Sequence, residues 1–320
     1  MMKVLFLSAV SVCLEIASDT PYYAPKPYRI YLNDSFVREG KTNVFSLFSL
    51  LPGQDYRVRL AWDDAEEELV IRTLTERCDL NVKDFGAKGD GVREDTLAIQ
   101  TAINCLPKGA RLRFPPGEYL TLPLTLKSHM VIDLAKGARL LAVPDRSSYP
   151  VIPGEAASSS GERIFFGGFE GNPGPMYQSL LTAQYAEDIT ILGEGCVDGN
   201  AQNSDFWKTY RQDPVARPRI LFMNRCEGIT LQGVTICNSP SWQLHPYYCD
   251  GVRIYDVTVK APKDSPNTDA CDPESCDHTE IKRIIDLAPA GIIIPMIMDE
   301  NDAARAVSYC RYPINGGTRG

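Results

Sequence analysis

The sequence has few of the residues that build metal sites, and none of them in a recognisable pattern. There are only three histidines, and the ten cysteines form no Cys-x-x-Cys pair and no cluster at zinc-site spacing from a histidine. Structural zinc sites place four such ligands at short, regular spacings, so we expect no metal and no cofactor. The scattered cysteines favour free thiols in a reducing compartment over a disulfide framework.

An excess of positive charge and a long apolar run are also lacking. The net charge is −8 over 320 residues, which argues against nucleic acid as a partner. An acidic substrate would therefore need a local cluster of Arg and Lys. No stretch is long enough to span a membrane. Residues Met1 to Leu14 are as apolar as a short signal peptide, but Glu15 follows at once and no small-residue cleavage site is evident. We interpret this segment as structural and expect a cytoplasmic rather than a secreted protein.

Residues 1–76 read as a small β-sandwich. Apolar and polar residues partly alternate from Ser8 to Ile16, which indicates a first strand with an apolar inner face. Four further strands are predicted between turn signals: Tyr28–Leu32, Val44–Leu47, Tyr56–Trp62 and Glu68–Thr73. The run from Leu51 to Arg59 resembles the tyrosine corner of fibronectin type III domains, in which a Tyr hydroxyl holds a strand to the loop before it.

A second domain begins near Cys78. The segment Asn81–Gly91 predicts a strand and a glycine-rich turn, and Asp95 or Thr96 is placed to cap a helix whose apolar residues are Ile99, Ala102, Ile103 and Leu106. The glycines do not fit a phosphate-binding loop. The run Phe-Gly-Ala-Lys-Gly-Asp-Gly resembles the entry to pectin-degrading β-helices. That resemblance implies that the helix covers the open end of a solenoid.

Repeats follow at a spacing of 23 to 27 residues. Cys226–Ile236 and Cys249–Val259 share one pattern of two short strands joined by a Gly or Asp bend, and a third copy starts at Cys276. Ala186–Gly193 is a looser copy. One copy alone would suit a β-sandwich, but the fixed register of several copies predicts a parallel β-helix. The Ser/Gly/Pro-rich segment from Pro153 to Pro175 is expected to be a surface loop between coils.

The segment from Asp264 to Cys276 concentrates the chemistry. It holds four carboxylates and an amide between turn residues, and glycoside hydrolysis needs carboxyl groups as acid and as base or nucleophile. Asn267-Thr268-Asp269 followed by Asp-Pro-x-Ser-Cys resembles the first active-site motif of the polygalacturonases. Three earlier segments also resemble that family: Gly193–Asn200 with Trp207 after it, Arg217–Arg219, and Asn238–Pro246.

This resemblance implies an all-β fold: a fibronectin type III-like β-sandwich over residues 1–76, then an incomplete right-handed parallel β-helix over residues 77–285. Residues 286–320 form a tail without family resemblance. The implied activity is hydrolysis of α-1,4-galacturonide linkages in pectin or oligogalacturonides by inverting acid–base catalysis, without a cofactor. Oligomeric state is left open.

The resemblance also assigns roles to single residues. Asp269 matches an aspartate that activates the hydrolytic water, and Asn267 matches a substrate-binding amide. Trp242 and His245 are candidates for sugar contacts by stacking and hydrogen bonding, with core burial as the equal alternative. We expect Asp272 to be structural, accepting hydrogen bonds from neighbouring backbone amides.

The chain departs from the family pattern after the Asn-Thr-Asp motif. The family's Gly-Asp-Asp pair, which contains the general acid, would fall at Ala290 and Gly291, and neither can transfer a proton. A Gly-His-Gly turn and an Arg-x-Lys clamp for the uronate are also missing. Two interpretations therefore stand beside each other: a hydrolase with impaired activity, and a non-catalytic pectin-binding remnant. A pectate lyase is a third interpretation, but a lyase would need a calcium site and a basic Arg, and no suitable cluster is visible.

Overall fold

The computed structural model describes residues 1–19, 22–282, 299–301 and 303–304. The expectations for Ala290 and Gly291, and nearly all of those for the tail from residue 286, lie outside this range. In the part that is described, no helix is long and apolar enough to cross a membrane.

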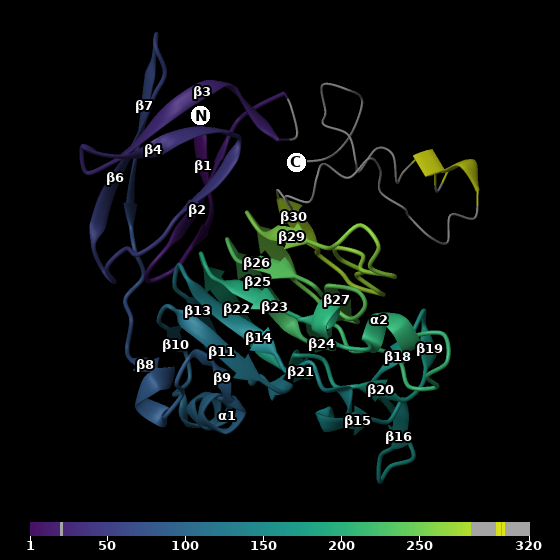
Figure 1. The fold of residues 1–320 in the computed structure, drawn as a ribbon. Coiled ribbons are helices and arrows are strands. Elements are labelled where there is room, and N and C mark those ends of the chain that lie inside the picture. Colours follow the sequence, from purple (N-terminus) through teal and green to yellow (C-terminus); the bar gives the residue numbers. More distant parts are fainter. Residues whose placement is uncertain (20–21, 283–298, 302, 305–320) are drawn as a thin grey trace.

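The N-terminal region consists of two antiparallel sheets that share one apolar core (Figure 1). One sheet has the order β1-β2-β5 and the other the order β4-β3-β6-β7. The strands are β1 (Met2–Leu7), β2 (Val12–Ile16), β3 (Tyr23–Leu32), β4 (Ser35–Thr42), β5 (Val44–Leu47), β6 (Asp55–Ala61) and β7 (Glu66–Arg72). The alternation that predicted these strands is visible in the core, where Leu14, Ile30 and Leu60 are fully buried.

Two details of this region differ from the sequence-based expectation or refine it. The segment before Ile16 forms two paired strands and not one, because Ser8 and Ser11 hydrogen-bond to each other and close a turn between β1 and β2. The hydroxyl of Tyr56 accepts a hydrogen bond of 2.8 Å from the backbone N–H of Leu51, as the tyrosine-corner pattern predicts. A relation to fibronectin type III domains stays a prediction.

The rest of the described chain is a parallel β-helix of three sheets, which confirms the predicted fold class. The seven-stranded sheet contains β8 (Asp79–Asn81), β10 (Ala110–Phe114), β13 (Met130–Leu134), β22 (Glu187–Gly193), β25 (Glu227–Gln232), β28 (Arg253–Tyr255) and β30 (Glu280–Lys282). The six-stranded sheet contains β9 (Asp90–Glu94), β11 (Gly117–Thr121), β14 (Ala138–Ala142), β23 (Cys196–Asp198), β26 (Thr235–Cys237) and β29 (Thr258–Lys260). The four-stranded sheet contains β12 (Leu124–Thr125), β21 (Leu181–Gln184), β24 (Leu221–Asn224) and β27 (Leu244–Tyr247).

The repeat pattern predicted the solenoid core but only two strands in each coil. A stacked solenoid core requires apolar side chains of both repeats to point inward, and five of them belong to one buried cluster: Ile229, Leu231, Val252, Ile254 and Val257. The third strand of each coil escaped notice because its residues do not alternate. In β24 all four side chains are buried, since the insertions on the outer side cover that face as well.

Helix α1 (Thr96–Cys105) lies at the end of the solenoid where β8 and β9 start, opposite β30 (Figure 1). Ile99, Ala102 and Ile103 face the core, as predicted. Asp95 stands at the N-cap position, but its carboxylate accepts hydrogen bonds from the backbone of Lys88 and Gly89 instead of capping the helix. The aspartate therefore fixes the glycine-rich turn that precedes the helix.

The segment expected to be a surface loop folds into short hairpins beside the four-stranded sheet. Its strands are β15 (Val151–Ile152), β16 (Glu155–Ala157), β17 (Arg163–Phe165), β18 (Gly168–Phe169), β19 (Asn172–Pro173) and β20 (Met176–Tyr177). A short helix, α2 (Phe206–Thr209), follows in the connection between β23 and β24, and 3-10 turns occur at Val82–Phe85, Arg146–Ser148 and Ala201–Asn203.

The N-terminal sheets contact the β-helix directly. Ser11 Oγ donates a buried hydrogen bond of 2.6 Å to Gln232 Oε1 at the end of β25. Cys13, on the β2 face that was expected to be polar, is fully buried and packs in one cluster with Val44 and Tyr255. Strand β2 thus buries both faces, one in its own sandwich and one against the solenoid.

Candidate active site

The Asn-Thr-Asp segment forms the next coil beside strand β27. The backbone N–H of Gln243 donates to the carbonyl of Asp269 at 2.8 Å, and β-bridges join Leu244 to Cys271 and Tyr247 to Glu274. The segment is thereby carried along the outer edge of the four-stranded sheet. Three of its four acidic residues, at positions 269, 272 and 274, share one short stretch of that edge.

Asp269 and Asn267, the two residues that the motif singles out, are both exposed. Asn267 has a left-handed backbone conformation with φ 54°, which turns the chain just before Asp269. The Asp269 carboxylate is open to solvent, as a group that activates water must be, while its backbone is fixed by Gln243. Both residues are therefore placed where a substrate can reach them.

Asp272 lies in a different environment from Asp269 although it is only three residues away. Its side chain makes no hydrogen bond within the described residues, and its Oδ2 atom is enclosed without a partner. The backbone amide contacts that we expected for it are not found. Burial, together with the negative charges of Asp269 and Glu274, raises the pKa of Asp272 to about 7, and Arg219 only partly opposes this shift.

Trp242 and His245 are both buried. Of the two alternatives given for them, sugar contact and core burial, the structure agrees with core burial. The Trp242 ring stacks on Phe169 of the inserted hairpins at 5.1 Å, and His245 lies edge-on to Trp242 at 4.9 Å. Burial lowers the pKa of His245, so its ring is neutral at pH 7; Nε2 lies 3.6 Å from Glu274 Oε2, beyond direct hydrogen-bonding distance. The hairpin β18–β19 and Glu274 line a narrow pocket around this ring.

Two arginines behind the segment were not assigned roles from the sequence. Arg217 holds the segment through three hydrogen bonds, to the Pro240 carbonyl at 2.7 Å, the Pro266 carbonyl at 2.9 Å and Asn267 Oδ1 at 2.6 Å. Burial lowers the pKa of Arg217 to about 10. The Arg-Pro-Arg spacing was the available signal, and the sequence did not show that the first guanidinium would reach an amide 50 residues away.

Arg219 is 1% exposed and forms no ion pair within the described residues. Its guanidinium lies 4.8 Å from the Trp242 ring and donates to the carbonyls of Gly168 and Arg217, while Nε has no partner there. Burial lowers its pKa to about 10. The positive charge of Arg219 stabilises the ionised forms of Asp272 and Glu274 electrostatically. The guanidinium itself is too deeply buried to contact a ligand.

Chemically, the edge offers one open carboxylate, one enclosed carboxyl that is half protonated near neutral pH, and a rigid backbone. Groups of three potential metal ligands are absent from this segment as far as the structure describes it. This arrangement suits proton transfer to and from an alcohol or water. The residues that form it lie on one edge of a parallel β-helix.

Comparisons with known proteins identify this class of β-helix. Residues 169–285 match the model of glycosyl hydrolases family 28, and residues 80–132 match the model described as rhamnogalacturonase A/epimerase, pectate lyase-like. The chain is therefore similar to a polygalacturonase-like family, and the family 28 match ends just after the last described strand.

Among curated proteins, a probable polygalacturonase of Vitis vinifera is 34% identical over 207 residues, which are 62% of this chain and 40% of that protein. An exo-poly-alpha-D-galacturonosidase of Dickeya chrysanthemi is 31% identical over 162 residues, which are 47% of this chain and 25% of that protein. The chain thus spans less than half the length of these two relatives.

Two solved structures share the fold. A hyperthermoactive exopolygalacturonase from Thermotoga maritima aligns with a TM-score of 0.52 and 30% identity, covering 64% of this chain and 51% of its own. A family 28 exopolygalacturonase from Yersinia enterocolitica aligns with a TM-score of 0.60 and 19% identity, covering 85% of this chain and 61% of its own.

Proposed function

We propose that this chain acts on pectin fragments as a polygalacturonase-type hydrolase, cleaving α-1,4-galacturonide linkages by inverting acid–base catalysis. The observation that supports it is the contrast between two neighbouring carboxyls, with Asp269 open to solvent and the pKa of Asp272 raised to about 7. Environments that drive two carboxyl pKa values apart are how glycosidases separate a base from an acid.

In this proposal Asp269 accepts a proton from the attacking water, and Asn267, oriented by Arg217, binds a sugar hydroxyl. The usual acid of the family would fall at Ala290 or Gly291, so this chain cannot use it. Asp272 is a proton source at neutral pH, but its Oδ2 atom is enclosed. We therefore propose slow hydrolysis, since general acid catalysis contributes roughly 10² to 10⁴ in rate.

A non-catalytic pectin-binding module is the second candidate, and the replacement of the family's acid by Ala290 and Gly291 favours it. Both candidates need Asn267 and the edge of β27 to bind an oligogalacturonide. They differ in whether any bond is cleaved.

The test is to incubate the purified chain, the Asp269→Asn variant and the Asp272→Asn variant with oligogalacturonides of defined length. Products are separated by anion-exchange chromatography, and binding is measured by calorimetry. Release of saturated products that Asp269→Asn abolishes supports the hydrolase. Unsaturated products that disappear with a chelator would point to a lyase. Binding without release would establish the binding module, and neither binding nor release would overturn both candidates.

A further inference from the structure

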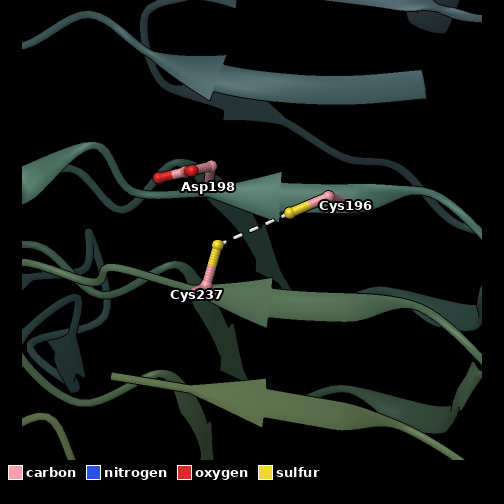
Figure 2. A group of neighbouring side chains, drawn as sticks. All are labelled: Cys196, Asp198 and Cys237. Atoms are coloured by element: carbon pink, nitrogen blue, oxygen red, sulfur yellow. Dashed lines mark hydrogen bonds between the residues drawn. The ribbon is translucent and has the colours of Figure 1, made fainter. Parts of the chain in front are cut away.

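Two cysteines and an aspartate meet on the outer face of the six-stranded sheet. Cys196 and Asp198 belong to β23 and Cys237 to the neighbouring strand β26 (Figure 2). The residues beside them, Val197 and Ile236, point into the solenoid core, so the three polar side chains lie on the opposite face. The two sulfur atoms are 3.5 Å apart, and one donor atom from each of the three residues lies within 4.8 Å of the other two.

The strand register argues against a disulfide between these thiols. Cys237 is paired with Asp198, and Cys196 with Thr235, so the two cysteines are diagonal neighbours. Diagonal Cα atoms in a sheet are about 7–8 Å apart, whereas disulfides usually need about 4.4–6.8 Å. Two thiolates on a tetrahedral zinc ion, each about 2.3 Å from the metal, are about 3.8 Å apart. The observed sulfur separation is close to that value without any backbone movement.

We propose that Cys196, Cys237 and Asp198 bind a thiophilic divalent cation of the zinc class. The fourth donor is Asn238, whose Nδ2 atom lies 3.0 and 3.1 Å from the two Asp198 oxygens and 3.5 Å from Cys237 Sγ. Half a turn about the last side-chain bond exchanges this NH₂ group for the amide oxygen. The ligand set is then two sulfurs and two oxygens around one position.

Charge balance supports this site. The Asp198 carboxylate is fully buried and paired with Arg139, and the backbone N–H of Asn200 holds its other oxygen at 2.7 Å. When both thiols ionise, two thiolates and one carboxylate are offset by a dication and Arg139, and two protons leave to solvent.

The site was not foreseen because its ligands are far apart in sequence. Short-range spacing rules detect zinc ligands two to five residues apart, whereas Cys196 and Cys237 are 41 residues apart and meet through the parallel register. The ion would tie two adjacent coils together. It would also fix Asn238, the first residue of the connection that carries Trp242 and the Pro240 carbonyl on which Arg217 is anchored.

The experiment uses the whole chain, purified under reducing conditions and freed of metal. Zn²⁺ is titrated in competition with a chromophoric chelator, and Co²⁺ is added separately to record thiolate-to-cobalt charge-transfer absorption. We expect one site per chain with that absorption. Cys196→Ser and Cys237→Ser should each weaken Zn²⁺ binding at least about 100-fold, since even changes around metal ligands cost about 10- to 100-fold. Cys105→Ser, at an exposed thiol on α1, is the matched control and should leave binding unchanged.

Asn238→Asp provides a test that keeps both thiols. It replaces the amide oxygen by a carboxylate and should tighten Zn²⁺ binding, while Asn238→Ala should weaken it. Circular dichroism of the metal-free variants shows whether each has folded. Zn²⁺ binding is also measured in the double variant Cys196→Ser/Cys237→Ser. Stoichiometric binding in that double variant would overturn the proposal, and so would an unchanged chain that binds Zn²⁺ no better than the double variant does. Cys226 and Cys249 are buried in the solenoid core. If the cobalt absorption were lost in Cys226→Ala but kept in Cys196→Ser, the ion would lie among these core cysteines, and this result would also overturn the proposal.

Discussion

Lys282, in the last described strand of the β-helix, forms an ion pair of 3.0 Å with Glu15 of strand β2, 267 residues earlier in the chain. The two side chains are 7% and 16% exposed, so both charges are largely removed from water. Removing one partner of such a pair leaves an uncompensated buried charge, which costs more than the pair itself contributes. The pair therefore holds the N-terminal sheets in one position on the solenoid.

We expect Lys282→Met to lower the free energy of unfolding by about 3 kcal/mol. The double change Glu15→Leu with Lys282→Met should recover most of this loss, because it removes both charges. Urea unfolding followed by tryptophan fluorescence measures the effect. Lys26→Met is the control, since its pair with Asp64 is exposed on both sides, and it should change the free energy of unfolding much less. Equal losses in the two variants would contradict the buried role.

Gly233 is a second determinant of the same contact. Its φ is 76°, and an added Cβ would overlap the ring of Phe48, which follows β5, and would lie 2.8 Å from the carbonyl oxygen of Gly193. Gly233→Ala should destabilise the protein by about 1–2 kcal/mol from the left-handed backbone alone, with a further loss from the displaced ring. Gly109→Ala has a similar backbone conformation, with φ 74°, and open space around the added carbon. A larger drop in melting temperature for Gly233→Ala measures the crowding of the added carbon by the Phe48 ring and the Gly193 carbonyl oxygen together.

Asp272 makes stability depend on pH in an unusual direction for a carboxyl. Its pKa rises from 3.8 to about 7 on folding, so the folded chain binds a proton that the unfolded chain has released between those values. The stability contributed by this group is complete below about pH 4 and is lost as the pH rises to about 7. Asp272→Asn should flatten that decline, and Asp264→Asn, in the exposed start of the same segment, should not. Denaturant midpoints at pH 4, 5.5 and 7 would show whether the slope changes.

Much of the fold could be predicted because its signals are local and repeated. The spacing of the Cys226 and Cys249 copies predicted a stacked core, and the prediction of a site at Asn267 depends on its motif alone. The third sheet could not be predicted, since β24 is buried on both faces and lacks alternation. Equally, the alternation of β2 suggested one polar face, but tertiary contact with Tyr255 buries Cys13 there.

The electrostatics of the site could not be read from the motif. Asp269 and Asp272 look alike in sequence, and their difference arises from which side of the edge each one occupies. The anchoring of Asn267 by Arg217 depends on folding across two coils, and so does the meeting of Cys196 with Cys237. These contacts are determined by which residues of neighbouring strands are paired. Sequence motifs alone do not specify that pairing.

The Arg217 guanidinium holds the turn that precedes Asp269. It donates to two carbonyls and to Asn267, and hydrogen bonds from a charged donor contribute roughly 1.5–3 kcal/mol each to stability. Because these hydrogen bonds join the turn at Pro266 and Asn267 to the Pro240 carbonyl of the connection before β27, Arg217→Met should free residues 262–268 to open locally. We expect amide hydrogen exchange in that peptide to accelerate at least about 10-fold, equivalent to about 1.4 kcal/mol, while the coils at β22 and β25 keep their protection. Arg211→Met, at an exposed arginine over the neighbouring Tyr210 ring, is the matched control and should leave exchange unchanged. Uniform acceleration across all coils in Arg217→Met would mean global destabilisation, and unchanged exchange at 262–268 would show that the backbone of β27 alone positions the acidic edge.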